Sequence, residues 1–220
     1  MGRNFWMLGD MSQVRSIVFD LDGTLYTDDG LAAEIQTMAA RLVADSRGVG
    51  LKEGRALLRK SKRRLAEMLE EEPTLTRTCQ TLGIEAVDFH RAMQTQVRPE
   101  NFLSTDPILQ ALLESLAEGW DLYLYTNNNL ALSEKILALL GVESYFKRLY
   151  TIEFNWTPKP DVDTLRRILE DIGGEPESFL FVGDRESVDL KAPRMLGIPT
   201  LLVTETADLL RIHQWLGMIP

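Results

Sequence analysis

The sequence is poor in the residues that build disulfides and soft-metal sites. Cys79 is its one cysteine, and His90 and His213 are its two histidines. A single cysteine excludes an intramolecular disulfide and a thiolate metal cluster. The two histidines lie far apart and lack HxxxH spacing, so we expect structural roles for both of them. Oxygen ligands and other nitrogen groups must therefore carry any chemistry.

Long hydrophobic runs are also lacking. No run reaches the roughly 18 apolar residues of a membrane span. The start, "MGRNFWMLGDMSQV", has neither the sustained apolar stretch nor the small-residue cleavage site of a signal peptide. We expect residues 1–11 to be an N-terminal tail, and the protein to be cytoplasmic with no membrane partner.

Positive charge is scarce relative to negative charge. The 220 residues include 24 basic and 33 acidic ones, which gives a net charge of -9. An acidic surface repels phosphate backbones, so we expect no nucleic acid polymer as a partner. A bound cation can reverse the local field, however, and small phosphates therefore stay candidate ligands. The hydrophobic content of 45% is enough for a core, and the length suits one domain with an insert.

Four short apolar runs are typical of strands that are buried on both faces of a parallel sheet. They are residues 14–20 ("VRSIVFD"), 121–126 ("DLYLYT"), 179–183 ("FLFVG") and 200–203 ("TLLV"), with a weaker run at 148–151 ("RLYT"). Helical patterns at residues 131–140, 161–172 and 188–196 alternate with the later strands. This alternation predicts an α/β fold, in which helices cover both faces of a parallel sheet.

Residues 28–105 interrupt this alternation because they contain helical patterns and no convincing strand. The patterns cover residues 31–44, 51–71, 75–82 and 87–97. The insert carries 12 basic and 12 acidic residues, whereas the remainder carries 12 basic and 21 acidic ones. We predict a core domain of residues 12–27 and 106–220, and an all-α cap domain of residues 28–105 inserted after the first strand.

Polar residues stand where successive strands of the predicted sheet end. They are Asp20 and Asp22, then Thr126 and Asn127, then Lys159, and finally Asp184 with Asp189. Each group alone has an ordinary structural explanation, such as an Asp-Gly turn, a helix cap or a rigid loop. Because ligands of open α/β sheets bind beyond the carboxyl ends of the strands, all four groups together predict a site there.

The residue types in this set suit phosphate chemistry. Carboxylates in one place repel each other unless a cation lies among them, and all-oxygen ligands favour Mg²⁺. Lys159 and Thr126 supply a positive charge and a hydroxyl donor for an anionic group. One aspartate can attack phosphorus and form an aspartyl-phosphate, while the other protonates the leaving group and later activates water.

These residues resemble the four motifs of the haloacid dehalogenase superfamily. "DLDGT" at residues 20–24 is similar to the first motif, Thr126 to the second, Lys159 to the third, and "GDRESVD" at residues 183–189 to the fourth. Order and spacing agree over nearly the whole chain. The resemblance implies a Rossmann-like three-layer core and a helical cap of the first type, which closes over the active site. One departure is Arg185, which stands where a small or acidic residue is frequent.

The resemblance also implies a role for each matched residue. Asp20 is expected to be the nucleophile and an Mg²⁺ ligand, and Asp22 the general acid/base with its carbonyl on the metal. Asp184 would complete the metal site, and Asp189 would support it from outside. Thr126, Asn127 and Lys159 would bind the phosphoryl group. Thr24 would support the first loop.

Asp22 favours phosphoryl transfer over dehalogenation, because a departing halide needs no protonation. We therefore predict an Mg²⁺-dependent phosphomonoesterase, a monomer or homodimer, that hydrolyses a small phosphorylated metabolite. The insert and the stretch "TNNN" are similar to the pyrimidine 5'-nucleotidase-like branch, and Trp156 offers a ring that either stacks on a base or packs its own loop. A phosphosugar mutase and a non-catalytic phosphometabolite-binding protein stay open as alternatives.

Overall fold

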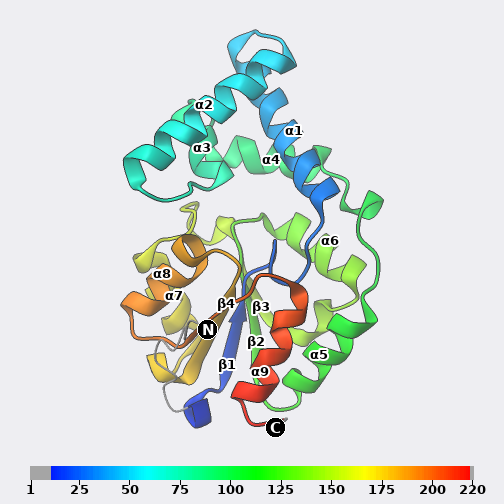
Figure 1. The fold of residues 1–220 in the computed structure, drawn as a ribbon, viewed down its shortest axis with the longest axis vertical. Coiled ribbons are helices and arrows are strands. Elements are labelled where there is room, and N and C mark those ends of the chain that lie inside the picture. Colours follow the sequence, from blue (N-terminus) through cyan, green and yellow to red (C-terminus); the bar gives the residue numbers. More distant parts are fainter. Residues whose placement is uncertain (1–10, 219–220) are drawn as a thin grey trace, which may run out of the picture.

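The computed structural model describes residues 11–218 (Figure 1). The expected N-terminal tail lies outside the described residues except for Met11, which begins a short 3₁₀ helix, Met11–Gln13. Every helix in the described part of the chain is too short or too polar to cross a lipid bilayer.

A five-stranded parallel sheet forms the core. Its strands are β1 (Ser16–Phe19), β2 (Asp121–Tyr125), β3 (Phe146–Tyr150), β4 (Phe179–Gly183) and β5 (Thr200–Leu202). Their order across the sheet is β3-β2-β1-β4-β5, and each neighbouring pair is parallel. The strand that precedes Asp20 is therefore the central one, with the strand before Thr126 on one side and the strand before Asp184 on the other.

Helices cover both faces of this sheet, which makes three layers (Figure 1). Because side chains alternate along a strand, Ile17 and Phe19 of β1 pack on one face and Val18 packs on the other. The first face is covered by α5 (Pro107–Ala117), α6 (Leu130–Leu140) and α9 (Leu210–Trp215). The second is covered by α7 (Val162–Ile172) and α8 (Lys191–Met195). The predicted Rossmann-like core is confirmed.

Four helices form the cap above the carboxyl edge of the sheet (Figure 1). They are α1 (Asp29–Arg47), α2 (Leu51–Leu69), α3 (Leu75–Thr81) and α4 (Ala86–Gln96). The side chain of Asp28 accepts a hydrogen bond from Leu31 N at the start of α1, and Gly48 ends that helix with a left-handed φ of 64°. The all-α cap inserted after the first strand is confirmed, while the exact domain boundaries stay a prediction.

The observed elements differ from the predicted ones in three places. The structure contains α5 and α9, which are not among the predicted helices, although Asp106 and Pro107 are a typical start for α5. The edge strand β3 begins at Phe146, because an edge strand tolerates the exposed Lys147 and Arg148. The helix expected at residues 188–196 is divided into a π-helical turn, Glu186–Leu190, and α8.

Candidate active site

The candidate site begins at the end of the central strand. Asp20 follows β1 directly, is 4% exposed, and is held there by a backbone hydrogen bond from its N–H to Val182 O at 2.9 Å. Thr24 Oγ1 donates to Asp20 Oδ2 at 3.4 Å. The turn between them needs Gly23, whose φ is +88° and where an added Cβ would lie 2.4 Å from Asp184 Oδ2. The first motif and the fourth motif are therefore in van der Waals contact.

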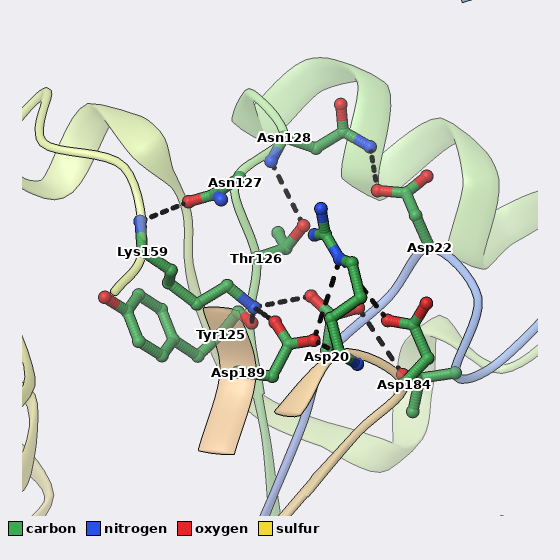
Figure 2. A network of polar contacts seen from close by, with 11 residues as sticks. Asp20, Asp22, Tyr125, Thr126, Asn127, Asn128, Lys159, Asp184 and Asp189 are labelled. Carbon is green, nitrogen blue, oxygen red and sulfur yellow. Dashed lines mark hydrogen bonds and ion pairs between the residues drawn. The ribbon is translucent and has the colours of Figure 1, made fainter. Parts of the chain in front are cut away.

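Lys159 is buried between two of the carboxylates (Figure 2). Its Nζ donates to Asp20 Oδ1 at 2.6 Å, to Asp189 Oδ1 at 2.7 Å and to the carbonyl of Tyr125 at 2.9 Å. Burial opposes the charge, but the two carboxylates outweigh it and hold the pKa of Lys159 above its ordinary value. The lysine is thus a fixed positive charge beside Asp20.

Three carboxylates lie together at this edge and could hold a metal ion. Asp20, Asp184 and Asp189 each offer an oxygen atom, and these oxygens lie within 4.8 Å of one another. Burial, followed by repulsion from Asp189, raises the pKa of Asp20 to about 7 and that of Asp184 to about 6. Asp184 Oδ1 is buried without a hydrogen-bond partner. An all-oxygen cluster in which one buried carboxylate oxygen accepts no hydrogen bond fits a hard divalent cation such as Mg²⁺.

Asp189 also orients its neighbours in this cluster. Burial disfavours its charge, but attraction to Lys159 and Arg185 outweighs that effect and lowers its pKa. Its Oδ2 accepts a hydrogen bond from the backbone N–H of Arg185 at 3.0 Å. Gly183 leaves room for it, because an added Cβ there would lie 2.4 Å from Asp189 Cβ. Asp189 therefore stays ionised and orients both Lys159 and the fourth-motif loop.

The carboxylate of Asp22 is held by hydrogen bonds from two side chains and lies outside the three-carboxylate cluster. Its Oδ2 accepts a hydrogen bond from Asn128 Nδ2 at 2.7 Å, and its Oδ1 accepts one from the hydroxyl of Tyr26. Burial raises the pKa of Asp22 above its ordinary value. The carboxyl group is thus fixed in orientation and more readily protonated than an exposed aspartate.

The loop after β2 carries two of the predicted phosphate-binding residues, Thr126 and Asn127 (Figure 2). Thr126 is 1% exposed, and its hydroxyl accepts a hydrogen bond from Asn128 N at 3.1 Å, so its own proton is free for another acceptor. Asn127 Oδ1 accepts a hydrogen bond from Lys159 N at 2.7 Å. Asn127 Nδ2 is buried and has no partner. The contact between Asn127 and Lys159 joins the second and third motifs. The Thr126 hydroxyl and Asn127 Nδ2 are left available as hydrogen-bond donors.

A cavity of about 340 Å³ lies over this site. Its lining includes Asp22, Asn128 and Asp184 from the core, and Ile35 and Phe89 from the cap. The volume is at the lower end of the range for small-molecule sites. A small ligand would therefore contact the carboxylates and the cap helices at the same time.

The structure brings together all of the predicted site residues: Asp20, Asp22, Thr24, Thr126, Asn127, Lys159, Asp184 and Asp189. The side chain of Asp22 does not belong to the three-carboxylate cluster, so its predicted contribution to the metal rests on its backbone carbonyl. Trp156 is 37% exposed and contacts the ring of His90 at 6.4 Å between centroids.

Sequence reasoning missed several residues that complete the site. Tyr26 and Asn128 orient Asp22, and their signal was their closeness in the chain to the first and second motifs. His90 lines the cavity from the cap, although it was expected to be only structural. Nothing in the sequence marks His90, because its position over the core depends on how the cap helices pack.

Comparison with known proteins agrees with this geometry. The family model described as haloacid dehalogenase-like hydrolase matches residues 14–197. A phosphoglycolate phosphatase of Cereibacter sphaeroides is 29% identical over 211 residues, which cover 90% of this chain and 88% of that protein. A phosphoglycolate phosphatase of Escherichia coli O157:H7 is 27% identical over 215 residues, with 90% and 84% covered.

Solved structures share the fold. A HAD phosphatase from Thermococcus onnurineus superposes with a TM-score of 0.65 at 20% identity, covering 93% of this chain and 98% of that one. A 2-haloacid dehalogenase from Pseudomonas syringae reaches a TM-score of 0.60 at 18% identity, with 93% and 99% covered. The family match spans most of the chain, and the chain therefore belongs to the haloacid dehalogenase-like hydrolases, as an enzyme whose curated relatives are phosphatases.

Proposed function

We propose that this hydrolase is an Mg²⁺-dependent phosphomonoesterase that works through an aspartyl-phosphate on Asp20. The observation that carries the proposal is the contact of Lys159 Nζ with Asp20 Oδ1 at 2.6 Å, inside a cluster of three carboxylates. A lysine beside a carboxylate nucleophile lets a dianionic phosphate approach it. A structural ion pair alone would need neither the third carboxylate nor the cavity above it.

The carboxylates of Asp20 and Asp184, with the backbone carbonyl of Asp22, would hold the Mg²⁺ ion. The ion would neutralise phosphate charge and raise the susceptibility of phosphorus to attack. Asp189 would contribute from outside, because its two oxygens are engaged by Lys159 Nζ and by Arg185 N.

Phosphoryl transfer would begin with attack of an Asp20 oxygen on phosphorus. Thr24 and Lys159 both contact the Asp20 carboxylate and would set the direction of its free lone pair. As the new O–P bond forms, the bond between phosphorus and the ester oxygen breaks. Lys159, the hydroxyl of Thr126 and the amide of Asn127 would bind the phosphoryl oxygens during this step.

Asp22 would serve as the general acid and then as the general base. Its raised pKa favours the protonated carboxyl, which gives its proton to the departing ester oxygen. The resulting carboxylate then accepts a proton from water, whose oxygen attacks the phosphorus of aspartyl-phosphate. This second step releases inorganic phosphate and restores the free Asp20 carboxylate. Tyr26 and Asn128 would keep Asp22 in position through both steps.

The substrate would be a small phosphorylated metabolite, with a nucleoside monophosphate as one candidate. The cavity of about 340 Å³ supports this size class. The relatives named phosphoglycolate phosphatase support phosphate ester hydrolysis as the reaction. A phosphosugar mutase would share the Asp20 and Asp22 pair, but it would return the phosphoryl group to a sugar hydroxyl instead of to water.

The test is phosphate release from a panel of esters, with Mg²⁺ and with EDTA. The panel holds nucleoside monophosphates, sugar phosphates and an aryl phosphate, and the Asp20→Asn variant is assayed beside the wild type. We expect metal-dependent release that the variant loses, because an amide is a poor nucleophile. Substantial release by a folded Asp20→Asn variant would refute the covalent step. No release from any ester would favour the mutase or a phosphate-binding protein.

A further inference from the structure

The cavity over the carboxylates has two ends of different chemistry. One end is lined by Asp22, Asp184 and Asn127 of the proposed phosphate and metal site, and by Asn128, which holds Asp22. The other end consists of residues from α1, α3 and α4 of the cap. A phosphate ester whose phosphorus lies at the first end would place its leaving group at the second. The lining of the cap end therefore bears on which leaving group fits.

The cap end is mainly apolar and carries little positive charge. Ile35, Leu75, Phe89 and Met93 contribute its apolar surface. Asp28 and Asp29 are the acidic residues of the cap that line it, and no lysine or arginine of the described cap residues does so. A second anionic group on the leaving group would meet desolvation and repulsion here rather than a counterion.

Arg185 is the one arginine among the described residues of the lining, and it belongs to the core. Its Nε lies 3.7 Å from Asp184 Oδ1 and 3.9 Å from Asp189 Oδ2. Attraction to Asp189, Asp20 and Asp184 raises its pKa despite its burial. The Nε of Arg185 therefore shares its positive charge with carboxylates at the phosphate end.

Uncharged polar side chains also stand among the apolar groups of the cap end, and they are Gln36, Thr74, Thr76 and His90. His90 is 2% exposed, and its Nε2 lies 3.1 Å from the hydroxyl of Thr76. Its Nδ1 is buried and has no hydrogen-bond partner in the described structure. The backbone carbonyl of His90 accepts a hydrogen bond from Asn129 Nδ2 of the core at 3.2 Å, which fixes α4 against the loop that carries Asn128.

Burial lowers the pKa of His90 to about 4, so the imidazole is neutral at neutral pH. A neutral imidazole with one ring nitrogen already engaged by Thr76 offers the other to one hydrogen bond. It can accept a hydrogen bond from a hydroxyl or an amide N–H, or donate one to an oxygen, but as a neutral group it supplies no counterion for a carboxylate. Buried polar atoms without partners are rare in folded proteins, and a ligand group is one common way in which they are satisfied.

We propose that the cap end of this cavity selects phosphate esters of uncharged, partly apolar alcohols, and that His90, supported by Thr76, hydrogen-bonds a polar group of the leaving group. His90 is then a specificity-determining residue. The inference rests on the proposed phosphatase activity and narrows its substrate class. It separates this chain from its curated relatives, because 2-phosphoglycolate carries a carboxylate on its leaving group.

A matched pair of substrates tests the charge preference. 2-Hydroxyethyl phosphate and 2-phosphoglycolate have the same carbon chain, and they differ in a terminal hydroxymethyl or carboxylate group. We expect kcat/KM to be at least about tenfold higher for the neutral ester, the scale on which one mismatched group is discriminated. An equal or higher kcat/KM for 2-phosphoglycolate would overturn the proposal. If the Arg185→Met variant then lost this activity on 2-phosphoglycolate, Arg185 would be the group that binds the carboxylate of the substrate.

A pair of variants tests the role of His90. His90→Phe keeps a flat ring but removes both nitrogens, and the assay compares 2-hydroxyethyl phosphate with phenyl phosphate, which has no hydroxyl to bind. We expect the ratio of their kcat/KM values to fall about tenfold, mainly through a higher KM for the hydroxyl-bearing ester. An unchanged ratio in folded enzyme would overturn the role.

His213→Phe is the matched control. His213 is 7% exposed, its Nε2 lies 2.5 Å from the hydroxyl of Ser115, and its Nδ1 also has no partner, but it belongs to α9 and does not line the cavity. We expect this variant to keep the wild-type ratio, whereas a matching fall would show a general effect of losing a buried imidazole. If His90→Phe fails to fold, Thr76→Val replaces it and is expected to shift the ratio in the same direction.

These outcomes are distinguishable from failure of the proposed activity. If neither ester, nor any other ester of the panel, releases phosphate in an Mg²⁺-dependent way, the phosphatase proposal fails. If release depends on Mg²⁺ and on Asp20 but favours the carboxylate-bearing ester, the phosphatase proposal stands and the inference about the cap end fails.

Discussion

Replacing Lys159 with methionine would remove the one positive charge that contacts both Asp20 and Asp189. The side chains of all three residues are at most 4% exposed, so water cannot replace the lost ammonium group. Breaking a buried ion pair by removing one partner is destabilising by about 3–5 kcal/mol, because a buried charge is left without compensation. We expect Lys159→Met to lower the free energy of unfolding by that amount near neutral pH in the presence of EDTA.

The pH dependence of this loss distinguishes charge from packing. In the variant, the pKa of Asp20, which is already raised to about 7, would rise further, and that of Asp189 would rise from its lowered value, because each carboxyl loses its cation and faces the other. A carboxyl whose folded pKa is raised contributes stability that is fully present below the unfolded pKa and is lost as pH rises through the folded pKa. The deficit of Lys159→Met should therefore shrink as the pH is lowered from about 7.5 towards about 5.

Denaturant unfolding at these two pH values, with EDTA and with saturating Mg²⁺, is the assay. Lys147→Met is the control, because Lys147 is exposed and lies 3.5 Å from Asp121, and surface pairs contribute only about 0–1 kcal/mol. Mg²⁺ should restore part of the stability of Lys159→Met, since an ion held by Asp20 and Asp184 would compensate the charge of Asp20. A loss below about 1 kcal/mol, or one that does not change with pH, would refute the electrostatic reasoning.

Three further predictions concern neighbouring residues. Asp22→Asn should lower kcat by about 10²–10⁴-fold, while its Mg²⁺ affinity, measured by calorimetry, should stay near the wild-type value. A large loss of Mg²⁺ affinity would contradict the role of Asp22 as general acid and base. Gly23→Ala should unfold at a lower denaturant concentration and bind Mg²⁺ more weakly, because the φ of Gly23 is +88° and an added Cβ would lie 2.4 Å from Asp184 Oδ2. Gly48→Ala is the control, because Gly48 has a φ of +64° but no atom within 4 Å of an added Cβ. This control should show the backbone effect on stability and leave the Mg²⁺ affinity unchanged. The lowered pKa of His90, about 4, means that the unfolded chain binds a proton that the folded chain does not between about pH 6.5 and 4. Stability should fall by up to about 3 kcal/mol as the pH drops through that interval, a component that His90→Phe should lack, and parallel pH profiles of the two proteins would contradict it.

Much of the fold could be predicted because the sheet is buried on both faces. A buried parallel strand must be apolar along its length, so the sequences of β1, β2, β4 and β5 stand out against their polar flanks. The amphipathic edge strand β3 and the short C-terminal helix α9 give weaker signals. The edge strand needs fewer apolar residues, and α9 has only six residues, too few for a clear helical period.

The sequence was sufficient to predict phosphate chemistry for the candidate site and its position at the carboxyl edge of the sheet. Asp20, Thr126, Lys159 and Asp184 follow strands that run in one direction, and parallel strands necessarily bring their carboxyl ends together. That inference needs only the strand positions and the rule that crossovers keep the strands parallel.

The pairing of these groups, and the residues that cover them, depend on contacts between distant parts of the chain. The ion pairs of Lys159 with Asp20 and Asp189 depend on side-chain directions within a few ångströms, which strand order does not specify. The placement of His90 over the cavity depends on the packing of α4 against the core, through a contact between residues 39 positions apart in the chain. A local pattern encodes helix and strand, whereas such contacts follow from the whole fold. For that reason the proposed leaving-group end of the cavity could not be predicted from the sequence.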